Sequence, residues 1–302
     1  MNSILLAIII PYYKISFFEE TLRSLANQTD KRFKVYIGDD ASSDDCSGLL
    51  EQFKGQIDFL YHRFESNLGG ASLTKQWKRC IALAENEQWL LILGDDDVLG
   101  ENVVAEFYKL KQQLDIEKVN VLKFASGVIN EQGNYLSEIY RHPVHENAAD
   151  AYYKHYKGES RSSLSEYIFR RSGYNKYKFT DFPLAWHADD KAWLDFSEGG
   201  ILYCCNDAVI QIRLSSENIS GKKDNIALKR EARVLFLEDI IKNKWSYFSY
   251  QQRKAFLFDF GMVIKEQGGV TLKRMILGFS KFCIMGDFYN AFRFIRRIYW
   301  IQ

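Results

Sequence analysis

The sequence predicts an α/β protein in which helices flank a mostly parallel sheet and a helical region follows toward the C-terminus. Three observations predict this class. Short apolar runs alternate with segments of helical periodicity through the first 125 residues, as in sheets whose parallel strands are joined by helices. Polar clusters follow the ends of several of these runs. The 302 residues are 47% hydrophobic and 26% charged, which is typical of a globular protein.

The predicted strands and helices of the first part alternate in chain order. Residues 4–10 form a continuous apolar run that Pro11 ends, which is typical of a strand buried on both faces. Further strands are predicted at residues 33–38, 57–63, 89–93 and 119–124. Apolar positions three and four apart predict helices at residues 17–28, 44–54, 72–85 and 101–114.

The pattern weakens after residue 130. Residues 135–185 are rich in Tyr, Lys and Arg. We predict a loop leading into a helix over residues 184–198 and a strand over residues 201–214. Amphipathic helices are predicted over residues 225–243 and 249–267.

The overall composition excludes several classes of protein. Lys and Arg number 40 against 39 Asp and Glu, so no net field favours nucleic acid as a partner. The five cysteines lack CxxC spacing, which is typical of reduced thiols and not of a disulfide framework or a zinc site. No run approaches the roughly 20 apolar residues that span a bilayer. We therefore expect a cytoplasmic protein, with peripheral attachment to the inner face of the plasma membrane as an alternative.

The polar clusters stand where the ligands of such sheets bind. They follow predicted strands at residues 12–14, at Asp39 and Asp40, at residues 67–70 and at residues 95–97. The carboxyl ends of parallel strands share one edge of the sheet, and ligands bind in the crevice beyond it. We therefore expect these clusters to meet in one site.

Three adjacent carboxylates, Asp95, Asp96 and Asp97, follow the strand predicted at residues 89–93. Like charges this close raise a carboxyl pKa, and a divalent cation such as Mg²⁺ or Mn²⁺ removes the conflict. Mg²⁺ takes one or two protein carboxylates together with substrate phosphates. A metal–diphosphate site and an acidic loop that caps the next helix fit the spacing equally well, and Asp97 suits such a cap.

Two further clusters have a binding and a structural interpretation. Asp39 and Asp40 can accept a hydrogen bond from a nucleobase, although a turn that bonds its own backbone is favoured from the residues alone. Residues 67–70 (NLGG) can bring backbone close to a phosphate or ribose, with Lys75 adding charge, but a plain glycine turn is simpler. The run matches neither GxGxxG nor the P-loop pattern.

Asp189 and Asp190 precede the helix that carries Trp193. Burial beside aromatic side chains would raise a carboxyl pKa toward the range of a general base, whereas helix capping is the simpler interpretation. The Tyr-rich segment of residues 135–185 suits an acceptor sugar or a surface subdomain in equal measure. Arg170 or Arg171 within it is a candidate for a phosphate contact.

The order of these motifs resembles glycosyltransferase family 2, which has the GT-A (Rossmann-like) fold. The resemblance rests on IIIPYYK at residues 8–14, ETLRSLANQT at 20–29, FKVYIGDDASSD at 33–44, NLGG at 67–70 and LGDDD at 93–97. It covers residues 4–110 most fully and residues 160–220 through later landmarks. It does not extend to the tail.

The resemblance implies an inverting, metal-dependent glycosyltransferase with Mn²⁺ or Mg²⁺ as cofactor. It would move a sugar from a nucleoside-diphosphate sugar, with UDP the expected nucleotide, to a hydroxyl of a saccharide or lipid-linked acceptor in bacterial-type surface polysaccharide synthesis. The implied catalytic domain covers residues 1–220, with a nucleotide-sugar half at 1–125 and an acceptor half at 126–220. Residues 221–302 form a helical, basic and aromatic region.

The resemblance also implies roles for particular side chains. Asp40, with Asp39 beside it, would read the nucleobase, and Asp190 would be the general base, with Asp189 as the one-residue alternative. Asp96, with Asp97 beside it, is the implied metal site, and Asp95 lies near the ribose. The other implied contacts are Pro11, Tyr13, Asn67, Gly69, Gly70 and Lys75 for the donor, and Arg170, Arg171 and Arg213 for the acceptor or a phosphate.

The sequence departs from the family pattern in two places. Gly94 replaces an acid that often comes first in the carboxylate motif, which leaves the geometry of metal binding open. Thr74 and Lys75 stand where many members have Arg-Asn, so the donor contacts there are also open. A non-catalytic sugar-nucleotide-binding protein and a nucleotidyltransferase are the alternative functions.

The C-terminal stretch of residues 270–302 is apolar and basic, with six Lys or Arg against one Asp. This composition fits an amphipathic segment on an anionic membrane surface. Packing on the catalytic domain and a homodimer contact are the alternatives.

Overall fold

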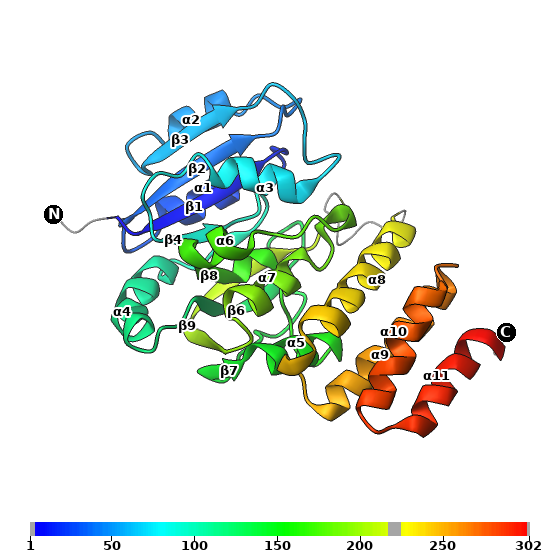
Figure 1. Ribbon diagram of the computed structural model, residues 1–302. Coiled ribbons are helices and arrows are strands. Elements are labelled where there is room, and N and C mark those ends of the chain that lie inside the picture. The colour runs from blue at the N-terminus through cyan, green and yellow to red at the C-terminus, as the bar shows by residue number, and fades with distance from the viewer. Residues whose placement is uncertain (1–3, 217–224, 301–302) are drawn as a thin grey trace. The chain divides into compact units, whose positions relative to one another are not determined.

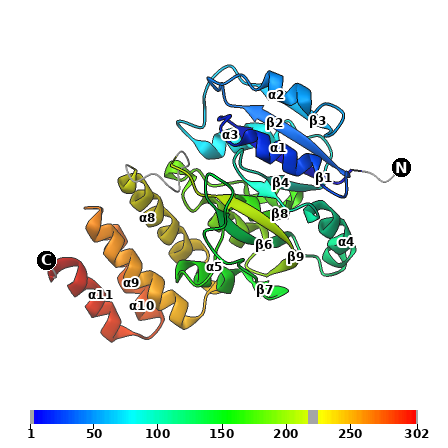
Figure 2. The same ribbon diagram turned by 180° about the vertical axis from the view of Figure 1, so that it is seen from behind.

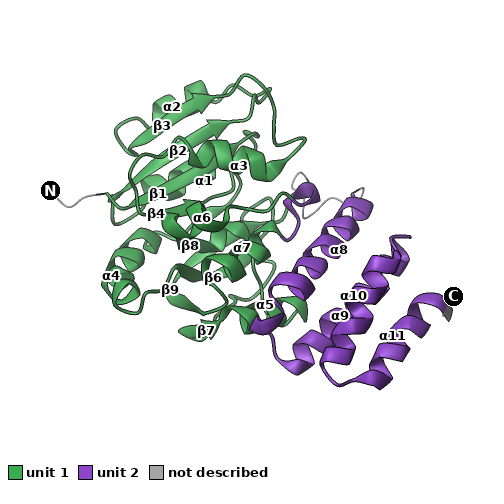
Figure 3. Ribbon diagram, in the orientation of Figure 1, with its two compact units in different colours: residues 1–181, 188–222 green, residues 182–187, 223–302 purple. Residues whose placement is uncertain are grey.

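The computed structural model describes residues 4–216 and 225–300 of the chain (Figure 1). The chain forms two compact units. One comprises residues 1–181 and 188–222, and the other comprises residues 182–187 and 223–302 (Figure 3). The second unit therefore takes a short segment from the middle of the chain, just before Asp189 and Asp190.

Among the described residues, the first unit contains a sheet of nine strands in the order β3-β2-β1-β4-β8-β6-β9-β5, with β7 beside β9. Its first four strands are parallel, because each is joined to the next by a helix that returns the chain to the same edge. In chain order these elements are β1 (Leu6–Tyr12), α1 (Phe18–Ala26), β2 (Phe33–Asp39), α2 (Ser47–Gln52), β3 (Phe59–Arg63), α3 (Leu73–Ile81) and β4 (Trp89–Ile92).

The rest of the sheet is mixed, so the sheet as a whole is less parallel than predicted. β8 runs antiparallel to β4 and β6, β6 and β9 are parallel, and β5 and β7 run antiparallel to β9. β5, β7 and β8 are two to four residues long, which is too short for a periodic signal. The elements are β5 (Val98–Leu99), α4 (Val103–Ile116), β6 (Val121–Ile129), β7 (His145–Asn147), α5 (Ala148–Tyr156), β8 (Tyr167–Arg170), α6 (Arg171–Tyr177), α7 (Ala188–Phe196) and β9 (Ile201–Arg213).

The central strand β1 shows why its sequence is continuously apolar. Helices cover both faces of the sheet: α6 and α7 lie in front of it in Figure 1, and α1 lies in front in Figure 2. Leu6, Ile8 and Ile10 of β1 pack in one cluster with Leu22 and Leu25 of α1. Successive side chains of a strand point to opposite faces, so both sets must be apolar.

β1 continues through Pro11 to Tyr12, two residues beyond the predicted end at residue 10. The carbonyl of Ile9 accepts a hydrogen bond from Leu93 N at 2.9 Å, so Pro11, two residues later, turns its backbone toward the same neighbour. The ladder between β1 and β4 has ended there, at Ile9 opposite Ile92. No strand on that side needs the N–H that proline lacks.

The second unit consists of helices around a phenylalanine core. Among the described residues its α-helices are α8 (Ile226–Asn243), α9 (Tyr250–Glu266), α10 (Leu272–Ile284) and α11 (Phe288–Trp300). A Cβ atom on Gly261 of α9 would lie 2.8 Å from the Phe294 ring of α11, so this glycine allows the two helices to approach. Within residues 4–216 and 225–300, no helix has the length and apolar character needed to cross a membrane.

Candidate active site

The site begins where β1 and β4 end side by side. The backbone N–H groups of Tyr13 and Lys14 both donate to Oδ2 of Asp95, at 2.8 and 2.9 Å. Burial and the neighbouring Asp96 raise the pKa of Asp95 to about 6, although these two N–H donors oppose the shift. The first and fourth predicted clusters of the parallel edge are thus in direct contact.

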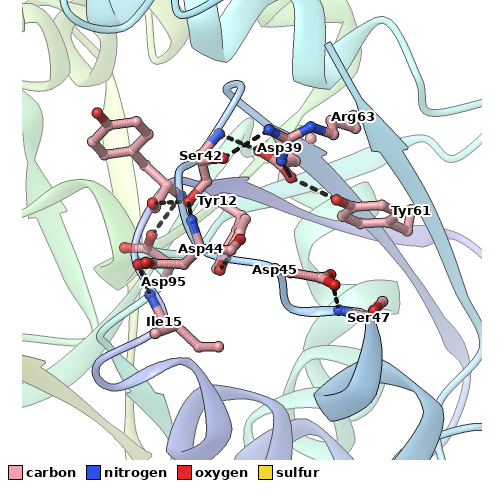
Figure 4. Close-up of polar contacts among 12 residues, drawn as sticks. Tyr12, Ile15, Asp39, Ser42, Asp44, Asp45, Ser47, Tyr61, Arg63 and Asp95 are labelled. Carbon is pink, nitrogen blue, oxygen red and sulfur yellow. Dashed lines mark hydrogen bonds and ion pairs between the residues drawn. The ribbon is translucent and has the colours of Figure 1, made fainter.

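Asp39 extends the same network toward β2 and β3. Its buried carboxylate accepts hydrogen bonds from Ser42 N at 2.8 Å, the Tyr61 hydroxyl at 2.5 Å and Arg63 at 2.8 Å (Figure 4). The Ser42 hydroxyl donates to the Tyr13 carbonyl at 2.6 Å. Continuous hydrogen bonding therefore runs from Asp39 through Ser42 and Tyr13 to Asp95.

Asp40 holds the turn at residues 67–70. Its buried carboxylate accepts from Leu68 N at 2.7 Å and Gly69 N at 2.8 Å, and it forms an ion pair with Arg79. Asn67 closes the same turn, because its Oδ1 accepts from Gly70 N at 2.7 Å. The structure thus joins the Asp40 and NLGG clusters, with Arg79 as a partner that the sequence did not indicate.

The start of α3 is bound by a residue that sequence reasoning missed. Asp181 accepts from the hydroxyls of Ser72 at 2.6 Å and Thr74 at 2.7 Å, and Lys75 Nζ lies 3.6 Å from its other oxygen. Asp181 lies 109 residues from Ser72 in the chain. Nothing in the local sequence around either residue signals this pairing.

Both carboxylate oxygens of Asp97 accept hydrogen bonds from the protein. The Ser165 hydroxyl donates to Oδ2 at 2.5 Å and the Arg213 N–H donates to Oδ1 at 2.9 Å. Burial and Asp96 raise the pKa of Asp97 to about 7. The oxygens of Asp97 thus anchor η1 (Leu164–Glu166) and β9, and its role as a metal ligand stays a prediction.

Asp95 and Asp96 are half-buried, whereas Asp97 is buried. A Cβ atom on Gly94 would lie 2.9 Å from Asp96 Oδ1 and 2.9 Å from Asp97 Oδ2. The side chains of Asp96 and Asp97 thus occupy the space that an acid at position 94 would need. This crowding gives a physical reason for glycine there.

The carboxylates at this edge could hold a hard divalent cation only together with substrate phosphates and water. No group of three or more His, Cys, Asp or Glu side chains in the described chain is arranged to hold a metal ion. Mg²⁺ and similar ions are commonly bound by one carboxylate together with substrate phosphates and water. Asp96, half-buried at this edge, is the candidate protein ligand of such an ion.

Asp189 and Asp190 lie in the first turn of α7. Asp190 is 6% exposed, and His155 Nε2 of α5 lies 3.9 Å from its Oδ1. Burial and the charge of Asp190 raise the pKa of Asp189. The sequence did not single out His155, which lies near the candidate base.

The tyrosines near Asp190 do not form a sugar-sized pocket. Asp190 lines a cavity of about 10 Å³ together with Tyr152, Tyr167 and Trp193, which has room for roughly one water molecule. The rings of Tyr167 and Trp193 stack at 4.1 Å. These aromatic side chains pack against α7, and an acceptor role for the Tyr-rich segment stays a prediction.

A buried charged layer connects the two groups of carboxylates. Glu166 follows Ser165, the partner of Asp97, and accepts from Arg161 at 3.1 Å. Glu166 also contributes to the raised pKa of Asp189, after burial and Asp190. Lys123 donates to the Arg161 carbonyl at 2.8 Å, and burial lowers its pKa, with Glu166 opposing that shift.

Two of the three predicted arginines lie away from the carboxylates. Arg170 pairs opposite Trp89 at the start of β4, where it contacts Asp115 at 2.5 Å. Arg171 donates to the Glu87 carbonyl at 2.5 Å. Both are at the opposite end of β4 from Asp95, because β8 runs antiparallel to β4. Their acceptor or phosphate role stays a prediction that this placement does not support.

Arg213 is near the carboxylates but fully buried. Its guanidinium donates to the Asp96 carbonyl at 2.9 Å and the Asn130 carbonyl at 2.8 Å, and it pairs with Glu20 at 2.5 Å. It fixes the backbone of the carboxylate loop. A contact with acceptor or phosphate, as predicted, does not fit this burial.

Comparison with known proteins relates the chain to sugar transfer. The family model "Glycosyl transferase family 2" matches residues 7–179. The glycosyltransferase GlyG of Streptococcus pneumoniae serotype 4 is 25% identical over 116 residues, which are 38% of this chain and 38% of that protein. The match therefore spans well under half of that relative.

Solved structures with the same fold cover nearly the whole chain. TarS 1–349 of S. aureus in complex with UDP-GlcNAc has a TM-score of 0.63 at 16% identity and covers 95% of this chain and 89% of that chain. The longer S. aureus TarS gives 0.60 at 17% identity, covering 95% of this chain and 49% of that chain. GalNAc-T7 with UDP, GalNAc and Mn²⁺ gives 0.52 at 14% identity, covering 88% of this chain and 56% of that chain.

Proposed function

We infer the function from the premise that this chain belongs to glycosyl transferase family 2. The reaction proposed is the transfer of a sugar from a UDP-sugar to an acceptor hydroxyl, with inversion at the anomeric carbon. The observation that carries the proposal is the continuous network from Asp39 to Asp95 at one sheet edge, with half-buried Asp96 next to it. The structural likeness to a UDP-GlcNAc complex supports UDP as the nucleotide.

Asp39 and Asp40 are proposed to bind the nucleobase. A carboxylate has about four acceptor positions, and each of these two uses three on protein donors. By this count one acceptor position remains on each carboxylate. Because Asp39 is fully buried, Asp40 would meet the base N–H, with Asp39 beside it. Asn67, Gly69 and Gly70, held by Asp40, and Lys75 would border the diphosphate or ribose.

Charge on the departing nucleotide is the main barrier that the site must lower. A divalent ion, Mn²⁺ or Mg²⁺, would neutralise the diphosphate when bound, and Asp96 would be its protein ligand. Lys75, on the exposed first turn of α3, adds a positive group. Pro11, Tyr13 and Asp95 are proposed to contact the donor. The Tyr13 N–H donates to Asp95.

Asp190 is proposed as the general base. It takes the proton of the acceptor hydroxyl as that oxygen bonds to the anomeric carbon and the bond to the diphosphate oxygen breaks. Asp189 remains the alternative. Asp190 is buried between α5 and α7.

The acceptor is proposed to be a saccharide or a lipid-linked saccharide of a cell-surface polysaccharide, used at the cytoplasmic side of the membrane. Residues 270–302 would then meet the anionic membrane surface. Homodimer formation through the same region is the competing proposal. A non-catalytic sugar-nucleotide-binding protein and a nucleotidyltransferase are the competing functions.

A panel of sugar nucleotides with Mn²⁺ tests the proposal. Release of nucleoside diphosphate supports glycosyl transfer, binding without turnover supports a binding protein, and release of pyrophosphate supports a nucleotidyltransferase. Asp96→Ala is expected to lose metal-dependent donor binding, and Asp190→Asn to keep donor binding and lose transfer. Asp207→Asn, an exposed carboxylate on β9, is the matched control. Full turnover by Asp190→Asn would show that the base is assigned to the wrong residue.

A further inference from the structure

We propose that the outer faces of α10 and α11 form a docking surface for an anionic lipid bilayer. We call this surface the aromatic–basic face. It comprises Leu272, Ile276, Phe288, Tyr289, Phe292, Arg293, Arg296 and Tyr299. The proposal rests on the proposed function only for its purpose, which is to bring the enzyme to a lipid-linked acceptor.

α11 has two clearly different sides. Phe288, Tyr289 and Phe292 are 61%, 76% and 68% exposed, and at spacings of one and four residues they share one side of the helix. The opposite side is buried through Ala291, Phe294 and Ile298. The exposed aromatic side chains of α11 therefore do not belong to the core of the second unit.

α10 continues the same apolar surface. Leu272 is 71% exposed and Ile276 is 57% exposed, one turn apart on the helix. The rings of Phe279 and Phe292 meet at 5.7 Å, which joins the outer faces of the two helices. Contiguous exposed apolar surface of this kind marks an interaction site.

The charge of the face selects the partner. Arg293 and Arg296 are exposed among the aromatic residues, and Lys273 is exposed on α10. The one acid in residues 270–299, Asp287, accepts from the Tyr250 hydroxyl at 2.7 Å and lies 3.8 Å from Lys254. Aromatic side chains flanked by arginines suit the boundary between anionic headgroups and acyl chains.

Self-association and insertion across the bilayer fit this face less well. In a symmetric dimer the same surface meets its own copy, so the arginines of both chains would be brought together. A helix of 13 residues, the length of both α10 and α11, reaches only about 20 Å, short of the roughly 30 Å hydrocarbon core. Lying on the surface is the arrangement that remains.

Sedimentation of the full chain with vesicles tests the proposal. We expect binding to vesicles of phosphatidylglycerol and phosphatidylcholine, weakening at high salt, and no binding to phosphatidylcholine alone. Arg293→Gln with Arg296→Gln is expected to weaken binding roughly 30-fold, since each basic residue near an anionic surface contributes about five-fold. Lys109→Gln with Lys176→Gln, exposed on the first unit, removes the same charge and should leave binding unchanged.

The double variant Phe288→Ser with Tyr289→Ser tests how much the exposed aromatic side chains contribute to vesicle binding. Thermal unfolding checks that the substitutions at these exposed positions leave the fold intact. UDP-sugar hydrolysis without vesicles should be the same in all variants, so loss of docking is separate from loss of the proposed activity. Equal binding to neutral and anionic vesicles, or no effect of the arginine variant, would overturn the proposal. A dimer that dissociates in Phe288→Ser with Tyr289→Ser, without vesicle binding, would replace it with self-association.

Discussion

At the scale of single residues, one buried carboxylate organises the turn between β3 and α3. Asp40 accepts two N–H groups of residues 67–70 and pairs with Arg79. Gly69 is required there for space, because a Cβ atom on it would lie 2.5 Å from Asp40 Oδ2. The turn and the carboxylate are therefore one unit, and a change in either displaces the other.

Gly69→Ala should weaken donor binding. The added methyl forces Asp40 away from the turn, and a buried hydrogen-bonded charge that loses its partners costs about 1–3 kcal/mol. We expect the donor KM to rise roughly ten-fold and thermal stability to fall. Gly48→Ala in α2, where a Cβ atom would have open space, is the control and should gain a little stability. An unchanged donor KM in Gly69→Ala would separate the turn from donor binding.

His142 should make the fold sensitive to mild acid. Burial, with Lys123 and Lys154 adding to it, lowers the pKa of His142 to about 3. The unfolded chain takes up a proton below its ordinary pKa of about 6.5 and the folded chain does not, so stability is retained above that pH and is lost as pH falls toward 3. At pH 5 the loss is about 2 kcal/mol.

Chemical denaturation of His142→Phe at pH 7.5 and pH 5 measures this effect. The variant keeps a ring of similar size and lacks the titrating group, so its stability should fall less between the two pH values than that of the natural chain. His62→Phe, at an exposed position, is the control and should retain the acid sensitivity. An equal loss of stability between pH 7.5 and pH 5 in all three proteins would exclude His142 as the cause of the acid sensitivity.

At the scale of secondary-structure elements, the ends of helices near the site are fastened by residues from distant segments. Ser72 caps the N-terminus of α3, because its hydroxyl accepts from Lys75 N. Asp181 accepts from the hydroxyls of Ser72 and Thr74. Asp97 fastens η1 and β9 in a similar way. These links set the positions of elements that border the donor.

Asp181→Asn should act on the donor and not on the base. It removes the charge from two hydroxyl hydrogen bonds and from the Lys75 pair, which lowers stability by about 1–2 kcal/mol. Because α3 and the preceding turn then lose a support, we expect a higher donor KM with kcat unchanged. Asp45→Asn, which affects a carboxylate bound to Ser47 N at 2.8 Å before α2, is the control. A fall in kcat alone would contradict this role for Asp181.

At the scale of the whole molecule, the segment at residues 182–187 belongs to the helical unit but leads directly into α7 and its two acids. Leu184, Ala185 and His187 have positive φ angles of 58°, 54° and 67°, which is costly for residues other than glycine. The segment is held within its own unit, because the rings of Phe182 and His187 lie 6.1 and 4.8 Å from the ring of Phe236 in α8. The packing that holds these positive φ angles is therefore internal to the helical unit.

Phe236→Ala should impair transfer through this segment. The loss of a buried phenylalanine costs about 3–5 kcal/mol, and here it also releases the strained residues before Asp190. Phe256→Ala, equally buried in α9 and in contact with Phe248, is the matched control. We expect Phe236→Ala to lower kcat more than Phe256→Ala, with donor binding retained, in assays below both melting temperatures. Equal losses would show a general effect of destabilisation.

The sequence by itself determined the fold class, the parallel strands β1 to β4 and the edge at which the carboxylates gather. Strands buried on both faces must be apolar throughout, so they are visible in one dimension. The strand-end rule then places Asp39, Asp40 and Asp95 together without any coordinates. The short strands β5, β7 and β8 were not visible, because two to four residues carry no period. The catalytic and binding roles assigned to the carboxylates stay predictions.

Only the tertiary structure decided what each charged group contacts. Asp40 meets Arg79, Asp97 meets the Arg213 backbone and Ser72 meets Asp181, at separations of 39, 116 and 109 residues. Strand register and helix packing choose such partners, and no local pattern encodes them. The same cause turned Arg170 and Arg171 to the far end of β4, since the antiparallel direction of β8 is set by the completed sheet.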